Sequence, residues 1–280
     1  MNTDTPCPPG QIFRLVVAGN SLVFISSQEL ANEVCNEERF TKFVVSGLKE
    51  LRNGVRDGLF TANDPEEENW AIAHRILVPA FGPLMIRSMF DGEQLHTLTA
   101  FFPKPRVLTS WKDMYDIGTQ LVMKWARQGS NVPIVVTDDF TRLTLDTVGL
   151  CSMGIRFNSF YSEDLHPFIK AMGNMLKVAG NRSRRPGLVN SLLSNVPATE
   201  DKKFWADIEY MRSFSHELLA ARRNHPEDKQ DLMNALVLGR DPQTGQGLSD
   251  ESIVNNMITF LIAGKRSLNT SGALANSVAP

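Results

Sequence analysis

The 280-residue sequence lacks the short motifs that identify many catalytic and metal sites. It contains no glycine-rich phosphate-binding loop, no Gly-x-Gly-x-x-Gly dinucleotide fingerprint and no His-Glu-x-x-His zinc motif. Neither a Cys-x-x-Cys pair nor a Gly-x-Ser-x-Gly nucleophile elbow is present. The five histidines show no metal-ligand spacing. We therefore expect no catalytic residue and no metal ligand that a motif alone would reveal.

Excess charge, long apolar runs and cysteine are also scarce. The formal net charge is -2 without long blocks of one sign, so we expect no nucleic acid as a partner. No run reaches the roughly 18 apolar residues of a transmembrane segment, and residues 1–10 are polar and proline-rich, unlike a secretory signal. Three widely spaced cysteines argue against a disulfide framework and predict a reducing, cytoplasmic location.

What the sequence does contain is a helical apolar pattern after a short β-rich start. Hydrophobic residues make up 42% of the chain, enough for a substantial core in one large domain or two small ones. Two β-rich runs, 11–17 and 22–25, flank turn-forming residues and predict a hairpin. Helices are predicted over 29–35, 47–55, 66–77, 112–127, 139–153 and 201–223, and again after a capping Ser249. The predicted fold class is mainly α with a small N-terminal β part.

Two stretches depart from this pattern. Residues 91–111 have no clean period and include Phe-Phe-Pro-Lys-Pro, which a helix interior does not tolerate. Residues 265–280 follow a strongly apolar helical segment but change abruptly to Ser, Asn, Gly and Ala. We treat the first as an off-pattern insert and the second as an off-pattern tail.

One cluster of side chains suggests a binding site. Trp70 and His74 share a face of the predicted helix, and Arg75 lies about 100° further round. An indole N–H, an imidazole and a guanidinium so placed could grip a carboxylate. The alternative is a Trp packed into the core beside a solvated basic edge. Cys35 and Cys151 are interpreted as buried structural thiols.

Several strings together are more specific than this cluster. The first set is 57–61 with 69–70 and 73–77; the second is 141–151 with 156–161; the third is 239–251 with 259–264. Together these strings resemble the cytochrome P450 family, and within it the self-sufficient fatty-acid hydroxylases, in which a P450 is fused to a flavin reductase. The first set is similar to the B′–C region, the second to the E-helix region and the third to the approach to the I helix. The resemblance covers about residues 11–264 with gaps.

The resemblance implies an incomplete P450 fold that ends in the I helix. Residues 1–264 would form a partial haem domain with the insert 91–111, followed by the tail 265–280. The implied activity is a haem-thiolate monooxygenase that hydroxylates fatty acids or similar apolar substrates. Its electrons would come from NADPH through the FAD and FMN of a reductase, fused or separate, that is not present in this chain.

The resemblance also implies site residues of two kinds. Cofactor-binding residues would hold the haem propionates or let the I helix lie close over the ring; these are Lys49, Trp70, His74, Ala263 and Gly264. Substrate-facing residues would shape the approach to the haem; these are Phe60, Thr61 and Ala263.

The sequence departs from the family pattern at several positions. Lys265, Arg266 and Ser267 stand where an acid and a Thr should deliver protons. The single Glu-x-x-Arg match, 209–212, lies upstream of the I helix and is expected to be a surface pair. Asn20 and Phe24 replace the Arg and Tyr expected to anchor a substrate carboxylate. The axial Cys expected further downstream is not in the sequence, so no catalytic residue and no metal ligand is predicted within it.

These departures leave an alternative open: an inactive truncated remnant, or the product of a mis-spliced gene. Gly92-Glu93 and Gly264-Lys265 are dipeptides whose codons can spell an intron donor site. Translation of unspliced sequence at both places would account for the insert and for the tail.

Overall fold

In a computed structural model of the chain, the described residues are 12–17, 20–36, 38–44, 47–62, 67–81, 108–129, 132–183, 199–227, 229 and 231–275. Most of the predicted insert, 91–107, lies outside the described residues. So do Cys7 and residues 276–280 of the predicted tail.

A hairpin opens the fold. Strand β1 (Ile12–Val17) pairs antiparallel with β2 (Asn20–Ile25), in a register that sets Val17 opposite Asn20. The two-residue connection is the length that favours a tight hairpin, and the stacked rings of Phe13 and Phe24, 4.9 Å apart, reinforce the pair. The predicted hairpin is confirmed, with the second strand beginning two residues earlier than expected.

Helices, with the loops that connect them, form the rest of the described structure. They are α1 (Gln28–Val34), α2 (Gly47–Val55), α3 (Glu68–Leu77), η1 (Val78–Phe81), α5 (Leu108–Gln128), α6 (Val136–Met153), α7 (Pro167–Ser183), α9 (Thr199–Asn224), α10 (Leu232–Leu238) and α11 (Asp250–Ala275). The predicted fold class, mainly α with a small N-terminal sheet, is confirmed. Helices α7 and α10 were not predicted from the sequence.

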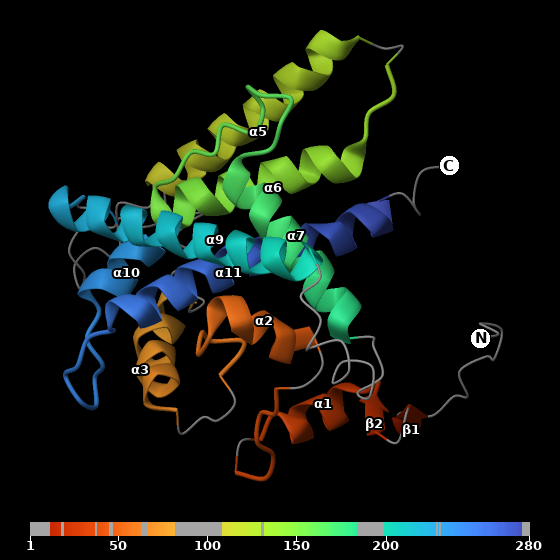
Figure 1. The fold of residues 1–280 in the computed structure, drawn as a ribbon, viewed down its shortest axis with the longest axis vertical. Helices are drawn as coiled ribbons and strands as arrows, with labels where there is room; N and C mark the ends of the chain where they lie inside the picture. The colour runs from red at the N-terminus through yellow and green to blue at the C-terminus, as the bar shows by residue number, and fades with distance from the viewer. Residues whose placement is uncertain are drawn as a thin grey trace, which may run out of the picture.

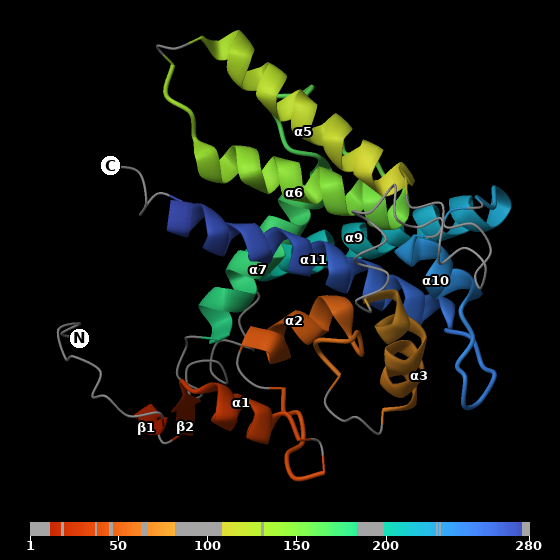
Figure 2. The ribbon, with the colours of Figure 1, turned by 180° about the vertical axis from the view of Figure 1, so that it is seen from behind.

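Helix α11 lies at the centre of the helical body and packs against α6, α9, α2 and α10 (Figures 1 and 2). Its apolar residues Ile253, Val254, Met257, Ile258 and Leu261 are each 0% exposed, because neighbours cover it on several sides. The predicted Ser249 cap is confirmed, since the Ser252 amide donates to its hydroxyl at 3.2 Å. The helix continues past Gly264 to Ala275, so the predicted tail begins inside it.

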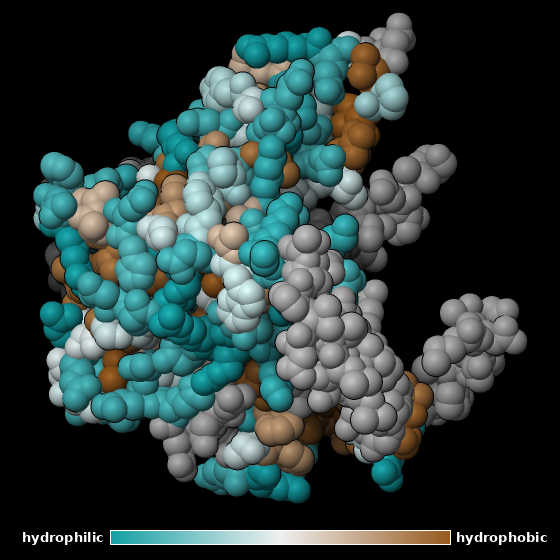
Figure 3. All heavy atoms as spheres, in the orientation of Figure 1, coloured by the Kyte–Doolittle hydropathy of each residue, from teal (hydrophilic) through white to brown (hydrophobic). Residues whose placement is uncertain are grey.

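The remaining elements surround this core. Helix α7 packs on α9 and α2, and α5 packs on α6 and extends away from the body (Figure 1). Side chains on the β hairpin are exposed, including Ile12, Val16 and Val23, and hydrophobic surface is visible there in Figure 3. In the described ranges, no helix combines the length and the hydropathy needed to cross a membrane.

Candidate functional site

The loop between α2 and α3, residues 56–61, is the centre of the candidate site. Arg56 has a positive φ of 44°, which turns the chain sharply at the end of α2. The hydroxyl of Thr61 donates to the Arg56 carbonyl at 2.7 Å and closes the loop. Gly58 lies so near α11 that a Cβ would collide with the Thr259 hydroxyl. Glycine is therefore required here for space, and the loop rests directly on α11.

The backbone N–H and the carbonyl of Leu59 both form hydrogen bonds to side chains. Its N–H donates to Asn256 Oδ1 of α11 at 3.1 Å. Its carbonyl oxygen accepts from the indole Nε1 of Trp70 at 3.1 Å and from the ammonium of Lys42 at 2.7 Å. Two donors from separate parts of the chain, one of them charged, thus converge on one oxygen atom.

The predicted face of α3 is partly confirmed. The rings of Trp70 and His74 stack at 4.7 Å with an interplanar angle of 21°, as their spacing of four residues predicted. Arg75 does not join them: it binds both carboxylate oxygens of Asp241, at 2.6 and 2.7 Å. The hydrogen bond from Arg75 holds the pKa of Asp241 well below its usual range. The idea that all three side chains grip one anion is therefore wrong for Arg75.

Lys42 supplies the cation that shares an acceptor with the Trp70 indole. Lys42 and Lys49 are both exposed residues, and the contact of Lys49 with a propionate stays a prediction. Partial burial of the Lys42 ammonium lowers its pKa. Sequence reasoning missed this residue because it precedes α2 in a segment without helical or strand periodicity, and its contacts are made only in the fold.

The two substrate-facing candidates of the loop differ in exposure. Phe60 is 50% exposed, so its ring is available to a ligand. Thr61 is 1% exposed, and its hydroxyl is engaged by the backbone of its own loop. Thr61 thus holds the loop together, and its contact with a substrate stays a prediction.

Ala263 and Gly264 lie on different sides of α11. A Cβ on Gly264 would stand 2.8 Å from Val148 Cγ2, so its small size serves close packing against α6. Ala263 is half-buried one turn beyond Thr259, on the stripe of α11 that meets Gly58. Near it on the helix, Phe260 stacks on Phe81 at 5.7 Å. Of the two, Ala263 is the better placed to face a cofactor or a substrate.

This donor set fits the carboxylate end of an apolar cofactor such as haem. A charged ammonium and an indole N–H already converge on one oxygen, which is the arrangement that a propionate accepts. The exposed ring of Phe60 follows directly after Leu59 in the loop, and Phe81 is 52% exposed at the end of η1, which follows α3. The site therefore combines polar donors with apolar rings on neighbouring elements.

Two further expectations are corrected. Arg212 is not part of a surface pair: it is 6% exposed and donates to the Gly54 carbonyl at 3.1 Å and to Asn255 Oδ1 at 2.8 Å. Cys35 is exposed rather than buried. Cys151 is partly buried, and burial raises the pKa of its thiol to about 12.

A family model described as cytochrome P450 matches residues 92–275. A bifunctional cytochrome P450/NADPH–P450 reductase of Aspergillus oryzae is 58% identical over 266 residues, which is 95% of this chain and 22% of that protein. A protein of the same description from Fusarium oxysporum is 49% identical, and a self-sufficient cytochrome P450 monooxygenase of Exserohilum turcicum is 48% identical, both with the same coverage. The chain spans about a fifth of the length of these relatives (22%).

Proposed function

The chain belongs to the cytochrome P450 family, and on that premise we propose that it forms the propionate-binding and substrate-facing part of a haem monooxygenase. The reaction would insert one oxygen atom into a C–H bond of a fatty acid or a similar apolar substrate. Electrons would come from NADPH through the FAD and FMN of a reductase, and the relatives described as bifunctional cytochrome P450/NADPH–P450 reductases support a reductase fused to the P450. We place this reaction in the cytoplasm, in line with the sparse, widely spaced cysteines.

The observation that carries the proposal is the convergence of Lys42 and Trp70 on the Leu59 carbonyl. In the proposed complex both donors turn to a haem propionate, which as an anion is the stronger acceptor. The stacked ring of His74 fixes the plane of the indole. We assign Lys42 the role predicted for Lys49.

The apolar side of the site follows from Phe60 and Ala263. The half-exposed ring of Phe60 would limit how an apolar chain approaches, and the small Ala263 would leave room for it beside α11. Burying such a chain against these side chains is favourable because it removes apolar surface from water. Bound haem supplies the activation of molecular oxygen, and the residues of this chain supply orientation and exclusion of water.

Neither described cysteine is suited to bind the iron. A thiolate is the ligating form, and burial raises the pKa of Cys151 to about 12, which keeps its thiol protonated. Cys35 is exposed at the C-cap of α1. We therefore propose that neither Cys35 nor Cys151 is the thiolate ligand.

The test is expression of the gene in a host that supplies haem, followed by incubation of the purified protein with NADPH and a long-chain fatty acid. A product one oxygen heavier than the substrate, absent without NADPH, supports the proposal. A protein that holds haem and oxidises NADPH but leaves every apolar substrate unchanged would contradict the assigned reaction.

The alternative proposal is an inactive product of incomplete splicing. It rests on the change of composition after Gly264, where Lys265 and Arg266 stand in place of a proton-delivering acid. Sequencing the transcript across codons 90–112 and 262–268 decides between them. Removal of both segments, with the frame running on, supports the monooxygenase; a transcript that matches the given sequence supports the inactive product.

A further inference from the structure

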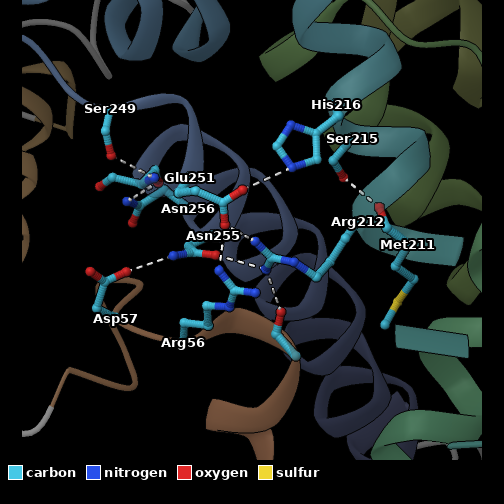
Figure 4. Close-up of polar contacts among 12 residues, drawn as sticks. Arg56, Asp57, Met211, Arg212, Ser215, His216, Ser249, Glu251, Asn255 and Asn256 are labelled. Carbon is cyan, nitrogen blue, oxygen red and sulfur yellow. Dashed lines mark hydrogen bonds and ion pairs between the residues drawn. The ribbon is translucent and has the colours of Figure 1, made fainter. Parts of the chain in front are cut away.

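Asn255 and Asn256, two adjacent residues of α11, bind the 56–61 loop through their side-chain amides. Their other hydrogen-bond partners determine whether the oxygen or the nitrogen of each amide faces the loop. Asn255 Oδ1 accepts from the guanidinium of Arg212 at 2.8 Å, which leaves Nδ2 to donate to Asp57 at 2.6 Å (Figure 4). Arg212 cannot accept a hydrogen bond, so the orientation of this amide is determined. The Arg212 guanidinium is itself held by Glu251 and by the Gly54 carbonyl.

The orientation of the Asn256 side-chain amide is determined in the same way. Its Nδ2 donates to the Ser252 carbonyl one turn earlier at 2.8 Å, so its Oδ1 faces outward from α11 and accepts from the Leu59 N–H at 3.1 Å. The residue is 0% exposed. The hydrogen bond is therefore shielded from solvent on the side of α11, and removal of the amide would deprive the Leu59 N–H of this acceptor.

The Leu59 peptide in turn determines where Phe60 stands. Its N–H is bonded to Asn256 on α11, and this bond limits rotation of the backbone just before Phe60 even when Lys42 and Trp70 bind a propionate instead of the Leu59 carbonyl. Gly58 adds a steric limit, because it packs against Thr259 without room for a Cβ. The half-exposed Phe60 ring thus projects from a backbone that is bonded firmly to α11.

We propose that Asn256 is a positioning residue for Phe60: it anchors the Leu59 peptide to α11 and so sets the direction in which the Phe60 ring meets a substrate. The inference rests on the proposed function only in taking Phe60 to face the substrate. The anchoring itself is a property of the loop and has its own readout.

The first experiment measures hydrogen exchange of the amides of residues 57–61 in the protein expressed from the gene. Asn256→Ala should raise their exchange rate about tenfold, because the Leu59 N–H loses a buried acceptor. Gly58→Ala should raise it as well, by pushing the loop off α11, and provides a second route if Asn256→Ala fails to fold. The matched control is Asn181→Ala, an exposed Asn on α7, which should leave exchange in the loop unchanged. Unchanged loop exchange in both Asn256→Ala and Gly58→Ala would overturn the inference.

The second experiment asks whether Asn256 acts through Phe60. Asn256→Ala should change the distribution of hydroxylation positions on the substrate, and the change should vanish when Phe60 is already Ala. An effect on the products that persists in the Phe60→Ala background would overturn the positioning role. Failure of the wild-type protein to form any product counts against the proposed function alone, and the exchange measurement then decides the inference by itself.

Discussion

The Lys42 ammonium and the Trp70 indole N–H meet at one acceptor, the carbonyl oxygen of Leu59, at 2.7 and 3.1 Å. Lys42 precedes α2 and Trp70 lies on α3, so only the folded chain brings them together. This pair of donors is the basis of the proposed haem site.

A pair of lysine substitutions tests this assignment against the one predicted from the sequence. Lys42→Met should lower the haem content of the purified protein about tenfold, since a charge-assisted hydrogen bond is worth about 1.5–3 kcal/mol. Lys49→Met removes an exposed cation of the same kind and should leave haem content unchanged. Haem absorbance per protein measures both. The reverse ranking would restore Lys49 and contradict our assignment.

Trp70 can be tested without losing its ring. Trp70→Phe keeps an aromatic side chain to stack on His74 but removes the indole donor. Haem should be lost several-fold faster to a competing apo-haem acceptor, while the thermal unfolding midpoint changes by only a few degrees. If haem loss is as slow as in the wild type, the indole does not hold a propionate.

The ion pair of Arg75 and Asp241 predicts a dependence of stability on pH. The folded-state pKa of Asp241 is lowered, chiefly by the hydrogen bond from Arg75. Its stabilisation is therefore fully present above the unfolded pKa, about 3.9, and is lost as pH falls through the lower folded pKa. Asp241→Asn should lower the unfolding midpoint at pH 7, with a difference from wild type that shrinks below pH 4.

Asp164→Asn is the control for this experiment. Asp164 pairs with Lys170, but its side chain is 85% exposed, so solvent screens the pair. Asp164→Asn should therefore change the unfolding midpoint much less than Asp241→Asn does at pH 7, and by a similar small amount at every pH. An Asp241→Asn effect that is independent of pH would show that the carboxylate charge is not its cause.

Arg222 and Asp231 form a buried ion pair, each with a side chain 6% exposed. Arg222→Met should destabilise the fold by about 3–5 kcal/mol, because it leaves a buried carboxylate unpaired. Asp231 also caps α10 by accepting from the Asn234 amide, and Asn caps helices nearly as well. The double variant Arg222→Met/Asp231→Asn should therefore recover part of the loss in urea unfolding. A double variant less stable than the single one would exclude the unpaired charge as the cause.

Substitution of Gly264 tests whether its small size is needed for close packing against α6 or for access of a cofactor. Gly264→Ala should destabilise the apo protein, since overpacking costs about 1–3 kcal/mol and helix propensity returns only about 1 kcal/mol. Val148→Ala opens the space that the new methyl group needs. The double variant should therefore lose less unfolding free energy than the sum of the losses in the two single variants. Additive effects would mean that Gly264 and Val148 do not share this contact.

Local patterns in the sequence predicted most elements of the fold, because the apolar spacing of each helix is a local property. The hairpin and the helices that became α2, α3 and α6 were placed to within a few residues. Helical spacing also predicted the shared face of Trp70 and His74, and the family resemblance added residues 57–61 of the loop.

The site was predicted less well, because its contacts join distant segments. Lys42 carries no local signal, and Arg212 lies on a helix where a charged residue is ordinarily solvated, yet α2 and α11 bury it. Asn255 and Asn256 could have been found: two carboxamides in the otherwise apolar run 253–258 indicate buried polar partners. Which partners they bind depends on the register of the loop against α11, which no local pattern specifies.

The central claim is that the protein seats a thiolate-ligated haem by means of Lys42 and Trp70. The most direct test is the absorption spectrum of the purified, reduced, carbon monoxide-treated protein from the gene, compared with the Lys42→Met/Trp70→Phe double variant. We predict the long-wavelength Soret band of thiolate ligation in the wild type and a large loss of that band in the double variant, at equal protein concentration. A wild-type protein without haem, or a double variant with an undiminished band, would contradict the account.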